Sequence, residues 1–455
     1  MPAFHLRRWA LAAMVAALPS MSYATATAEE AAKLGGELTP IGAIAAANAD
    51  GSVPAWKGET MFPADMKTWT PAYLEQLRTK DVKKLEGEFK KALPADVLNP
   101  FETVTKANMA KYADKLTEGH KALLNKYPSY KMKLYKSVRP GFFPKEVYDA
   151  TKKNATSAKL TGTDLVTGAA VGFPFPIPKS GAEVIWNHRM KYRGNAVKRF
   201  NNQAIVKPDG SYQITKLVED VKFKYANFKT PAAADNKYLL MYLSETISPP
   251  RVAGQLTLAH ELIGPDAGSG RAAWIFSPGL GRVNRAPDVG YDNPAVGTDN
   301  EQYFDQIDVF NGSLDRYDWK LVGRKEMYVP YNSYEMNSPL HKYKDILTPF
   351  NINQDYPRYE LHRVWVVDAT VKSGVRHNFA RRTFYVDEDS WSIAGVDCYD
   401  GRGQMWKVQE AHLVMLPFVP TLTGSPEIIY DLQSTRYFVT AMTNEDKISD
   451  FKVSF

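Results

Sequence analysis

From about residue 204 to the C-terminus, short runs of alternating apolar and polar residues follow one another and are separated by turn-forming residues. The runs YLLMYLSE, GQLTLAHELI and RAAWIFSPGLGRVNRA are examples. Their turn signals recur at intervals close to the roughly 8 to 12 residues that are typical of an antiparallel meander. Because each strand of such a series pairs with its neighbour, the sequence predicts a mainly β fold built on one large antiparallel sheet.

One predicted hairpin joins the segments ELHRVWVVDATVK and VRHNFARRTFYVD around Ser373-Gly374. If those two residues form the loop, Trp365 lies opposite Arg382. Trp365 and Phe384 then share one face of the sheet, whereas Val364 points to the other face. Both faces are partly apolar, so neither is expected to be fully solvated.

The part of the chain before these strands has a different character. Residues 29–179 are rich in Pro and Lys and contain segments such as AYLEQLRTKDVKKLEGEFKKAL, whose apolar residues recur at helical spacing. The proline-rich GFPFPIPK reads as an extended boundary, because proline lacks the amide donor that helices and central strands need. Ser180 and Glu183 then have the spacing of a capping box, which predicts a single helix over 180–192.

The N-terminus resembles an export signal. Residues 1–28 contain two early arginines, a short apolar stretch and several small-x-small sites, and cleavage is expected after Ala24, Ala26 or Ala28. The single cysteine, Cys398, lies far from this segment, so it offers no thiol for N-terminal lipidation and no partner for an intramolecular disulfide. We therefore expect a periplasmic protein of a Gram-negative cell that carries no lipid anchor.

The charge of the chain excludes some partners. Its 57 Lys and Arg residues exceed its 50 Asp and Glu residues by a net charge of +7. The basic residues are interspersed with acidic ones and form no stripe, so we expect no nucleic-acid partner. The apolar runs are shorter than the ~20 residues that a membrane-spanning helix needs, although transient contact with a membrane surface stays open.

Six long segments closely resemble one exported Gram-negative family, which lacks a defined function and is often labelled outer-membrane lipoprotein-sorting protein. The matching segments are LGGELTPIGAIAAANADGSVPAWKG (34–58), GFPFPIPKSGAEVIWNHRMKYRG (172–194), VNRAPDVGYDNP (283–294), DVFNGSLDRYDWKLVGRKEMYVPYNSY (308–334), ILTPFNINQDYPRYELHRVWVVDA (346–369) and RRTFYVDEDSWSIAGVDCYDGRGQMWKVQEAH (381–412). The family is similar to the LolA/LolB-like lipoprotein carriers. The resemblance implies an α+β fold in which a large, unclosed antiparallel β-barrel, or half-barrel, wraps around helices and encloses an apolar cavity for acyl chains.

The predicted organisation follows from these patterns. We expect a cleaved signal peptide over 1–28, a helical and irregular N-terminal extension over 29–179, and a LolA/LolB-like half-barrel domain over 180–455. An insertion dense in Asp, Asn and Tyr occupies about 291–343 and is longer than a sheet connection needs.

The polar residues give weak signals for catalysis or metal binding. The eight histidines form no HExxH motif and no Cys/His cluster, so no metal site and no cofactor are expected. Glu360 with His362, and Glu410 with His412, each share a strand face, but no nucleophile elbow accompanies them and a structural role is favoured. The acidic residues between 305 and 318 do not have EF-hand spacing, which leaves calcium binding open.

Aromatic side chains on the predicted helix and strands are the candidates for a ligand site. Each can also fill a core, but strands that are apolar on both faces leave room in a half-barrel for a ligand with an apolar chain. The predicted cavity-lining residues are Trp186, Trp274, Phe276, Trp365, Phe384, Trp391 and Trp406. Arg363, Arg381 and Arg382 are candidates to pair with an anionic head group at the rim.

These observations favour a periplasmic binding or carrier protein for a lipid, an acylated molecule or another amphiphile. The resemblance further implies transport between the inner and outer membranes with an RND-type exporter and an outer-membrane protein. Two alternatives stay open: an exported hydrolase acting on a lipid-like or aromatic substrate, and an outer-membrane assembly factor. A hydrolase predicts a nucleophile beside a base in the cavity, whereas an assembly factor predicts an exposed apolar patch. The sequence favours a carrier over an enzyme without deciding between them.

Overall fold

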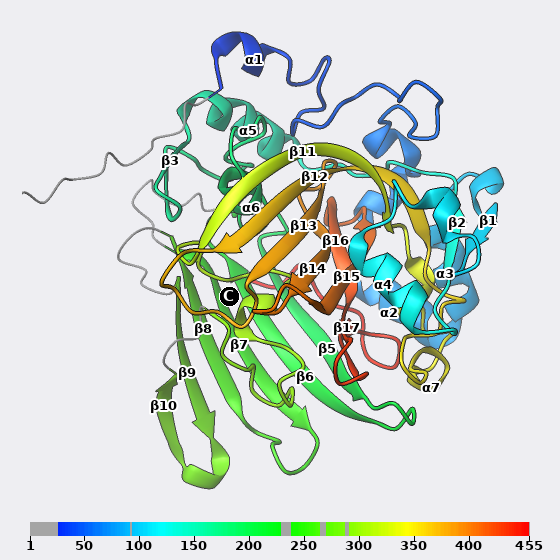
Figure 1. Cartoon of the computed structure of the whole chain (residues 1–455), viewed down its shortest axis with the longest axis vertical. Helices are drawn as coiled ribbons and strands as arrows, with labels where there is room; N and C mark the ends of the chain where they lie inside the picture. Colours follow the sequence, from blue (N-terminus) through cyan, green and yellow to red (C-terminus); the bar gives the residue numbers. More distant parts are fainter. Residues whose placement is uncertain (1–25, 92, 229–237, 264–269, 287–290, 455) are drawn as a thin grey trace, which may run out of the picture.

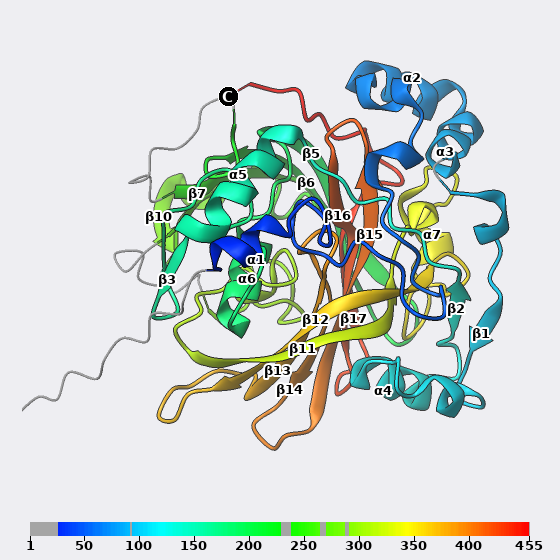
Figure 2. The same ribbon diagram turned by 90° about the horizontal axis from the view of Figure 1, so that it is seen from above.

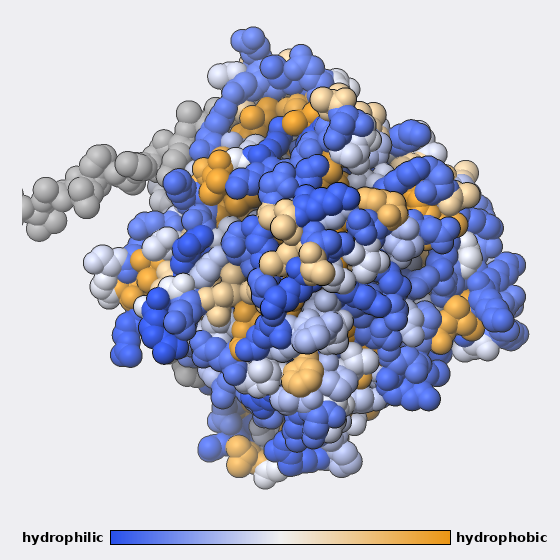
Figure 3. Space-filling view, turned by 45° about the vertical axis from the view of Figure 1, so that its right-hand side comes forward, coloured by the Kyte–Doolittle hydropathy of each residue, from blue (hydrophilic) through white to orange (hydrophobic). Residues whose placement is uncertain are grey.

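The computed structural model describes residues 26–91, 93–228, 238–263, 270–286 and 291–454. Most of the predicted signal peptide therefore lies outside the described residues. Within them, we find no helix whose length and apolar character would let it cross a membrane. The face shown in Figure 3 is mostly hydrophilic, and its apolar side chains form small, separate groups.

The described chain is organised around one sheet of 15 strands (Figure 1). The order of neighbours is β1-β2-β12-β13-β14-β15-β16-β17-β5-β6-β7-β8-β9-β10, with β11 on the other side of β12. The strands are β1 (Glu102–Val104), β2 (Met132–Tyr135), β5 (Ala196–Val206), β6 (Tyr212–Phe223), β7 (Tyr238–Ser248), β8 (Leu256–Leu262), β9 (Arg271–Ser277), β10 (Arg282–Ala286), β11 (Tyr317–Pro330), β12 (Tyr359–Val371), β13 (Arg381–Asp387), β14 (Ile393–Tyr399), β15 (Met405–Leu416), β16 (Thr421–Asp431) and β17 (Tyr437–Met442). Among these pairs only β2 and β12 run parallel.

The helices lie inside and around this curved sheet. They are α1 (Ala28–Ala32), α2 (Pro71–Lys80), α3 (Val82–Lys90), α4 (Glu118–Lys126), α5 (Lys145–Ser157), α6 (Gly181–Arg189) and α7 (Tyr343–Ile346), and a separate hairpin consists of β3 (Lys159–Thr161) and β4 (Leu165–Thr167). Seen from above, the sheet follows an open curve with α6 inside it (Figure 2). The predicted fold class, a mainly β protein with a large unclosed antiparallel sheet around helices, is confirmed.

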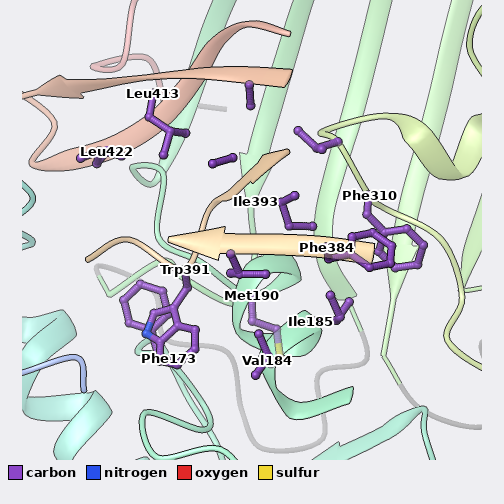
Figure 4. Close-up of a cluster of buried hydrophobic side chains, with 14 of the residues drawn as sticks. Phe173, Val184, Ile185, Met190, Phe310, Phe384, Trp391, Ile393, Leu413 and Leu422 are labelled. Carbon is purple, nitrogen blue, oxygen red and sulfur yellow. The ribbon is translucent and has the colours of Figure 1, made fainter. Parts of the chain in front are cut away.

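Helix α6 begins at the predicted capping box. The Ser180 hydroxyl accepts the N–H of Glu183 at 3.3 Å, and the Glu183 carboxylate accepts the N–H of Ser180 at 3.2 Å. Every residue of α6 is buried, so the helix is a central core element. In Figure 4, Val184 and Ile185 of α6 lie among the side chains of Phe384 and Ile393 in a continuous apolar cluster.

The hairpin of β12 and β13 is antiparallel as predicted, but its predicted register is wrong. Trp365 pairs with Val386, four residues beyond the predicted Arg382, which instead pairs with Ala369. Strand β12 ends at Val371 and β13 begins at Arg381, so the connection is longer than a two-residue loop. Because the shift is an even number of residues, every side chain keeps its predicted face of the sheet.

The N-terminal extension and the predicted insertion both contribute strands to the sheet. Strands β1 and β2 come from the extension, and β2 pairs with the first residues of β12. Strand β11 comes from the 291–343 segment and pairs along the whole of β12. The sequence signal for these strands is weak because each is isolated among irregular segments, whereas β5 to β9 follow one another directly.

Candidate ligand-binding site

A cavity of about 470 Å³ lies against one face of β5, β6, β7, β8 and β9. We call this the inner face; it carries Val197, Val221, Tyr242, Ala259 and Ala273, which pair with one another from strand to strand. Residues of β15, β16 and β17 continue this wall, and the remaining walls come from α2, α3, the segments 295–311 and 334–339, and the C-terminal residues around 448. This volume falls within the range of small-molecule binding sites, roughly 300 to 1,000 Å³.

Much of the cavity wall is apolar. Since side chains alternate between the two faces of a strand, every second residue of β5 to β9 points into the cavity. Ala259 and Ala273 are small and buried, and the larger side chains of Tyr242 and Phe304 pack against them. The larger apolar residues of the wall are Leu74, Leu85, Phe89, Val197, Leu217, Val221, Phe223, Leu240, Ile275, Phe304, Phe418, Phe438 and Ile448.

A polar band crosses this wall beside the row of Val197 and Val221. Arg199 of β5 forms an ion pair with Glu219 of β6, and these two residues are cross-strand partners. The Glu219 carboxylate also accepts Nδ2 of Asn201 at 3.0 Å and the hydroxyl of Tyr242 at 2.7 Å. Burial and the adjacent Glu219 carboxylate raise the pKa of Tyr242 well above its ordinary value, so the phenol keeps its proton and donates.

A second ion pair joins β8 and β9, and its arginine also binds the opposite wall. Arg271 of β9 donates to Glu261 of β8 at 2.5 Å. It also donates to the backbone carbonyls of Phe304 and Asn311, at 3.3 and 3.2 Å. These bonds hold the 304–311 segment against the strands and close that side of the cavity.

Asp308 lies at the inner end of the same segment. Lys191 and Arg193, which follow α6, donate to its carboxylate at 2.9 and 2.6 Å. Although burial opposes ionisation, these two cations hold the pKa of Asp308 well below its usual range. Asp308 is therefore an ionised anchor that joins the cavity wall to the central helix.

Glu427 of β16 lines the cavity and forms no ion pair with a described residue. It lies opposite Thr440 of β17, and its Oε2 atom accepts the backbone N–H of Val309 at 3.2 Å. Burial and the neighbouring Asp308 raise the pKa of Glu427 to about 7, against the opposing effect of Arg199 and Lys191. Its carboxyl group therefore changes charge near neutral pH.

The hydroxyl groups of the described cavity wall are not paired with a histidine. Among the described residues of this wall there is neither a histidine nor a cysteine. Its Ser and Thr hydroxyls therefore have no imidazole beside them to act as a general base. The wall can bind a ligand through apolar contact and hydrogen bonding.

The structure places the seven predicted aromatic residues outside the wall of this cavity. Phe384 and Trp391 are buried in the core cluster around α6 (Figure 4). Trp186 is buried in the same cluster, and Trp365 and Trp406 pack against it. Trp274 and Phe276 lie on β9, in alternation with Ala273 and Ile275 of the inner face, so they belong to the outer face. The wall residues that the sequence analysis missed lie on the alternate positions of β5 to β9. The available signal was the turn at Pro208-Asp209-Gly210, around which Arg199 and Glu219 pair, although the first predicted strand began only at about residue 204.

The three predicted rim arginines also lie outside the cavity wall, where they bind other residues of the protein. Arg382 is buried and donates to Asp305 at 2.7 Å. Arg381 donates to Asp368 at 3.2 Å, and Arg363 donates to the carbonyl of Ala46 at 3.0 Å and lies 3.5 Å from Glu388. None of the three lines the cavity.

The side chains of the two predicted carboxylate–histidine pairs are buried, but only Glu360 and His362 make a close contact. His362 lies 3.1 Å from Glu360, and the ring of His362 stacks on Tyr331 with centroids 3.6 Å apart. Glu410 binds His120, also at 3.1 Å, in place of a close contact with His412.

One group of described residues brings metal-binding atoms together. Ligand atoms of His362, Asp387 and Asp389 lie within 4.8 Å of one another. Arg139 donates to both oxygens of Asp389, at 2.8 Å each, and Glu360 engages the imidazole of His362. Arg139 therefore neutralises Asp389 as in a buried ion-pair network, whereas Oδ1 of Asp387 has no hydrogen-bond partner among the described residues.

Two carboxylates of the acidic segment considered for calcium, Asp305 and Asp308, are paired with cations of the protein. Asp305 binds His377 and Arg382, at 2.8 and 2.7 Å. Asp308 binds Lys191 and Arg193, so both carboxylates have cationic partners from the protein.

Comparison with known proteins identifies the family. The family model described as "Protein of unknown function (DUF1329)" matches residues 103–454. An uncharacterized protein of Pseudomonas aeruginosa is 41% identical over 441 residues, which cover 96% of this chain and 92% of that protein. The chain therefore belongs to the DUF1329 family, and the predicted family resemblance is confirmed.

Two solved structures are similar to the chain at lower identity. A DUF1329 family protein of Desulfovibrio piger is 14% identical, with a TM-score of 0.40, over 58% of this chain and 88% of its own. A LolA superfamily protein of Nitrosomonas europaea is 11% identical, with a TM-score of 0.36, over 61% of this chain and 96% of its own.

Proposed function

We propose that this DUF1329 protein binds an amphiphile, such as a lipid or an acylated molecule, with the apolar chain of the ligand held against the inner face of β5 to β9. The observation that supports this proposal most strongly is the cavity of about 470 Å³, whose wall combines apolar side chains such as Leu217 and Ile275 with buried ion pairs that are formed within the protein. Each CH₂ group removed from water contributes about 0.8 kcal/mol, so such a wall favours an alkyl chain over water.

The proposed role is that of a periplasmic carrier. The N-terminal pattern of residues 1–28 supports export. A molecule with a long apolar chain needs protection from water between two membranes, which a wall of this kind provides. Transfer between the inner and outer membranes with an RND-type exporter and an outer-membrane protein extends this proposal.

Titration of the purified protein with a fluorescent long-chain acyl probe tests the binding function. The proposal expects saturable binding with one probe per chain and displacement by unlabelled amphiphiles. A folded protein that binds no such probe contradicts it. Turnover of an ester-linked probe would replace the carrier with the hydrolase.

A second candidate, the assembly factor, is favoured by one observation on the outer face. Leu243, Leu256 and Val283 are 41%, 36% and 62% exposed there, and they lie near Trp274 and Phe276 on neighbouring strands. Exposed apolar patches of this kind occur at protein contact sites. Replacing Leu243 and Val283 with Ser would separate the two functions, because a carrier keeps its probe affinity and an assembly factor loses its partner.

A further inference from the structure

We infer that Glu427 anchors the head group of the bound amphiphile, so that the cavity selects a single-chain molecule whose head donates hydrogen bonds, such as an ammonium or a hydroxyl, over one with an anionic head. This inference rests on the proposed function, namely that an apolar chain occupies the cavity.

Glu427 differs from the other charged groups of the wall in lacking a counter-ion. Arg199 pairs with Glu219, Arg271 with Glu261, and Arg193 with Asp308, while Glu86 pairs with Lys90. Arg251 and Asp299 are exposed. Among the described wall residues that are not exposed, Glu427 is thus the charged side chain without an ion pair.

The carboxylate of Glu427 has unused acceptor capacity. Its Oε2 atom accepts one hydrogen bond, from the backbone N–H of Val309, and its Oε1 atom makes none to a described residue. A carboxylate has about four acceptor sites, so several remain for a ligand. A donor head would satisfy them, whereas a carboxylate or phosphate head would bring two anions together at low dielectric.

The surroundings of Glu427 suit the polar end of an amphiphile. Its cross-strand partner Thr440 donates to Oδ1 of Asn201 at 3.2 Å, and Asn201 in turn donates to Glu219. This polar band runs beside the apolar row that begins with Val197 and Val221. Val197 and Val221 of that row are buried, whereas Leu217, Thr257 and Ile275 are half-buried and line the cavity. A ligand with its head at Glu427 can therefore lay its chain along these half-buried residues.

The ionisation of Glu427 depends on the charges that surround it. Asp308 faces it and disfavours its ionised form, while Arg199 and Lys191 favour that form. An ammonium head would add a third cation and hold the carboxylate ionised. Glu427 alone would therefore distinguish a cationic head group from an anionic one.

The test compares dodecylamine, dodecanol and dodecanoate as competitors of a neutral fluorescent alkyl probe at pH 8. The amine and the alcohol are expected to bind more tightly than the carboxylate. In Glu427→Gln the affinity for the amine should fall about tenfold or more, since hydrogen bonds to charged groups are the stronger ones. Glu245→Gln makes the same change on the outer face of β7 and should leave all three affinities unchanged.

The outcomes separate this inference from the function beneath it. If the neutral probe binds but the three head groups compete equally, or the carboxylate competes best, the inference is overturned and the binding function stands. If no alkyl probe binds the folded protein, both are overturned. If Glu427→Gln fails to fold, the wild-type protein is titrated at pH 8 and pH 5.5 instead. The affinity for the amine should fall at the lower pH, while the affinity for the alcohol stays constant. An equal change in both affinities overturns the inference.

Discussion

The guanidinium of Arg139 donates to both carboxylate oxygens of Asp389, each at 2.8 Å, and both side chains are only 1% exposed. This pair joins the N-terminal extension to the turn between β13 and β14. Arg139 also donates to the backbone carbonyls of Ile44 and Pro54, so one side chain gathers three distant segments of the chain. The extension is therefore held to the sheet by buried charge as well as by strands.

Replacing Arg139 with Met should destabilise the fold by about 3 to 5 kcal/mol, because it leaves the Asp389 carboxylate buried without its counter-ion. Urea unfolding followed by circular dichroism measures this loss. The double change Arg139→Met with Asp389→Leu should recover much of it. A single variant within about 1 kcal/mol of the wild type would show that the pair is not structural.

Filling the cavity should remove ligand binding without unfolding the protein. Thr257 lies half-buried on the inner face of β8 and lines the cavity, so Thr257→Trp places an indole where the chain of the ligand would lie. We expect at least a tenfold loss of affinity for the acyl probe. Leu258→Trp, the next residue on the outer face, is the matched control. Equal losses in both variants would argue against a site on the inner face.

Trp391 is predicted to act on stability more than on binding. Its side chain is fully buried, its indole N–H donates to the carbonyl of Ile41 at 3.0 Å, and its ring stacks on Trp365. Trp391→Ala should cost about 3 to 5 kcal/mol in the free energy of unfolding. The fraction that remains folded should bind the acyl probe with unchanged affinity. A folded variant with abolished binding would return this residue to the ligand site.

The raised pKa of Glu427 predicts a specific pH dependence of stability. Its ordinary value of 4.5 rises to about 7 in the folded protein, so between these values the folded state binds more protons than the unfolded state. Stability from this group is then present below pH 4.5 and is lost as pH rises towards 7. Glu427→Gln should therefore gain stability relative to the wild type between pH 5 and pH 7.5, by on the order of 1 to 3 kcal/mol. A constant difference across urea titrations at the two pH values would contradict the shift.

The elements with strong local signals were predictable from the sequence. The capping box of Ser180 and Glu183 marks the start of α6, and period-two alternation marks the strands and their faces. The register of β12 and β13 was not predictable, because the alternation is the same after any even shift and only the length of the loop fixes the pairing.

The ligand site was harder to locate for a physical reason. A large aromatic residue such as Trp391 looks the same in sequence whether it fills a core or lines a cavity. Space in a protein depends on how side chains from distant segments pack, and the three-dimensional curve of the sheet decides which inner-face positions, such as Thr257 and Ile275, are left open. Glu427 was missed because its isolation from counter-ions depends on partners far away in the chain.

The most direct test of the binding proposal is photolabelling with a long-chain alkyl probe that carries a diazirine near the end of its chain, followed by peptide mass spectrometry. The account predicts saturable labelling of the inner face of β6 to β9, at residues such as Leu217, Val221 and Ile275. Labelling confined to the outer-face residues Trp274 and Phe276, or no light-dependent labelling of the folded protein, would contradict it.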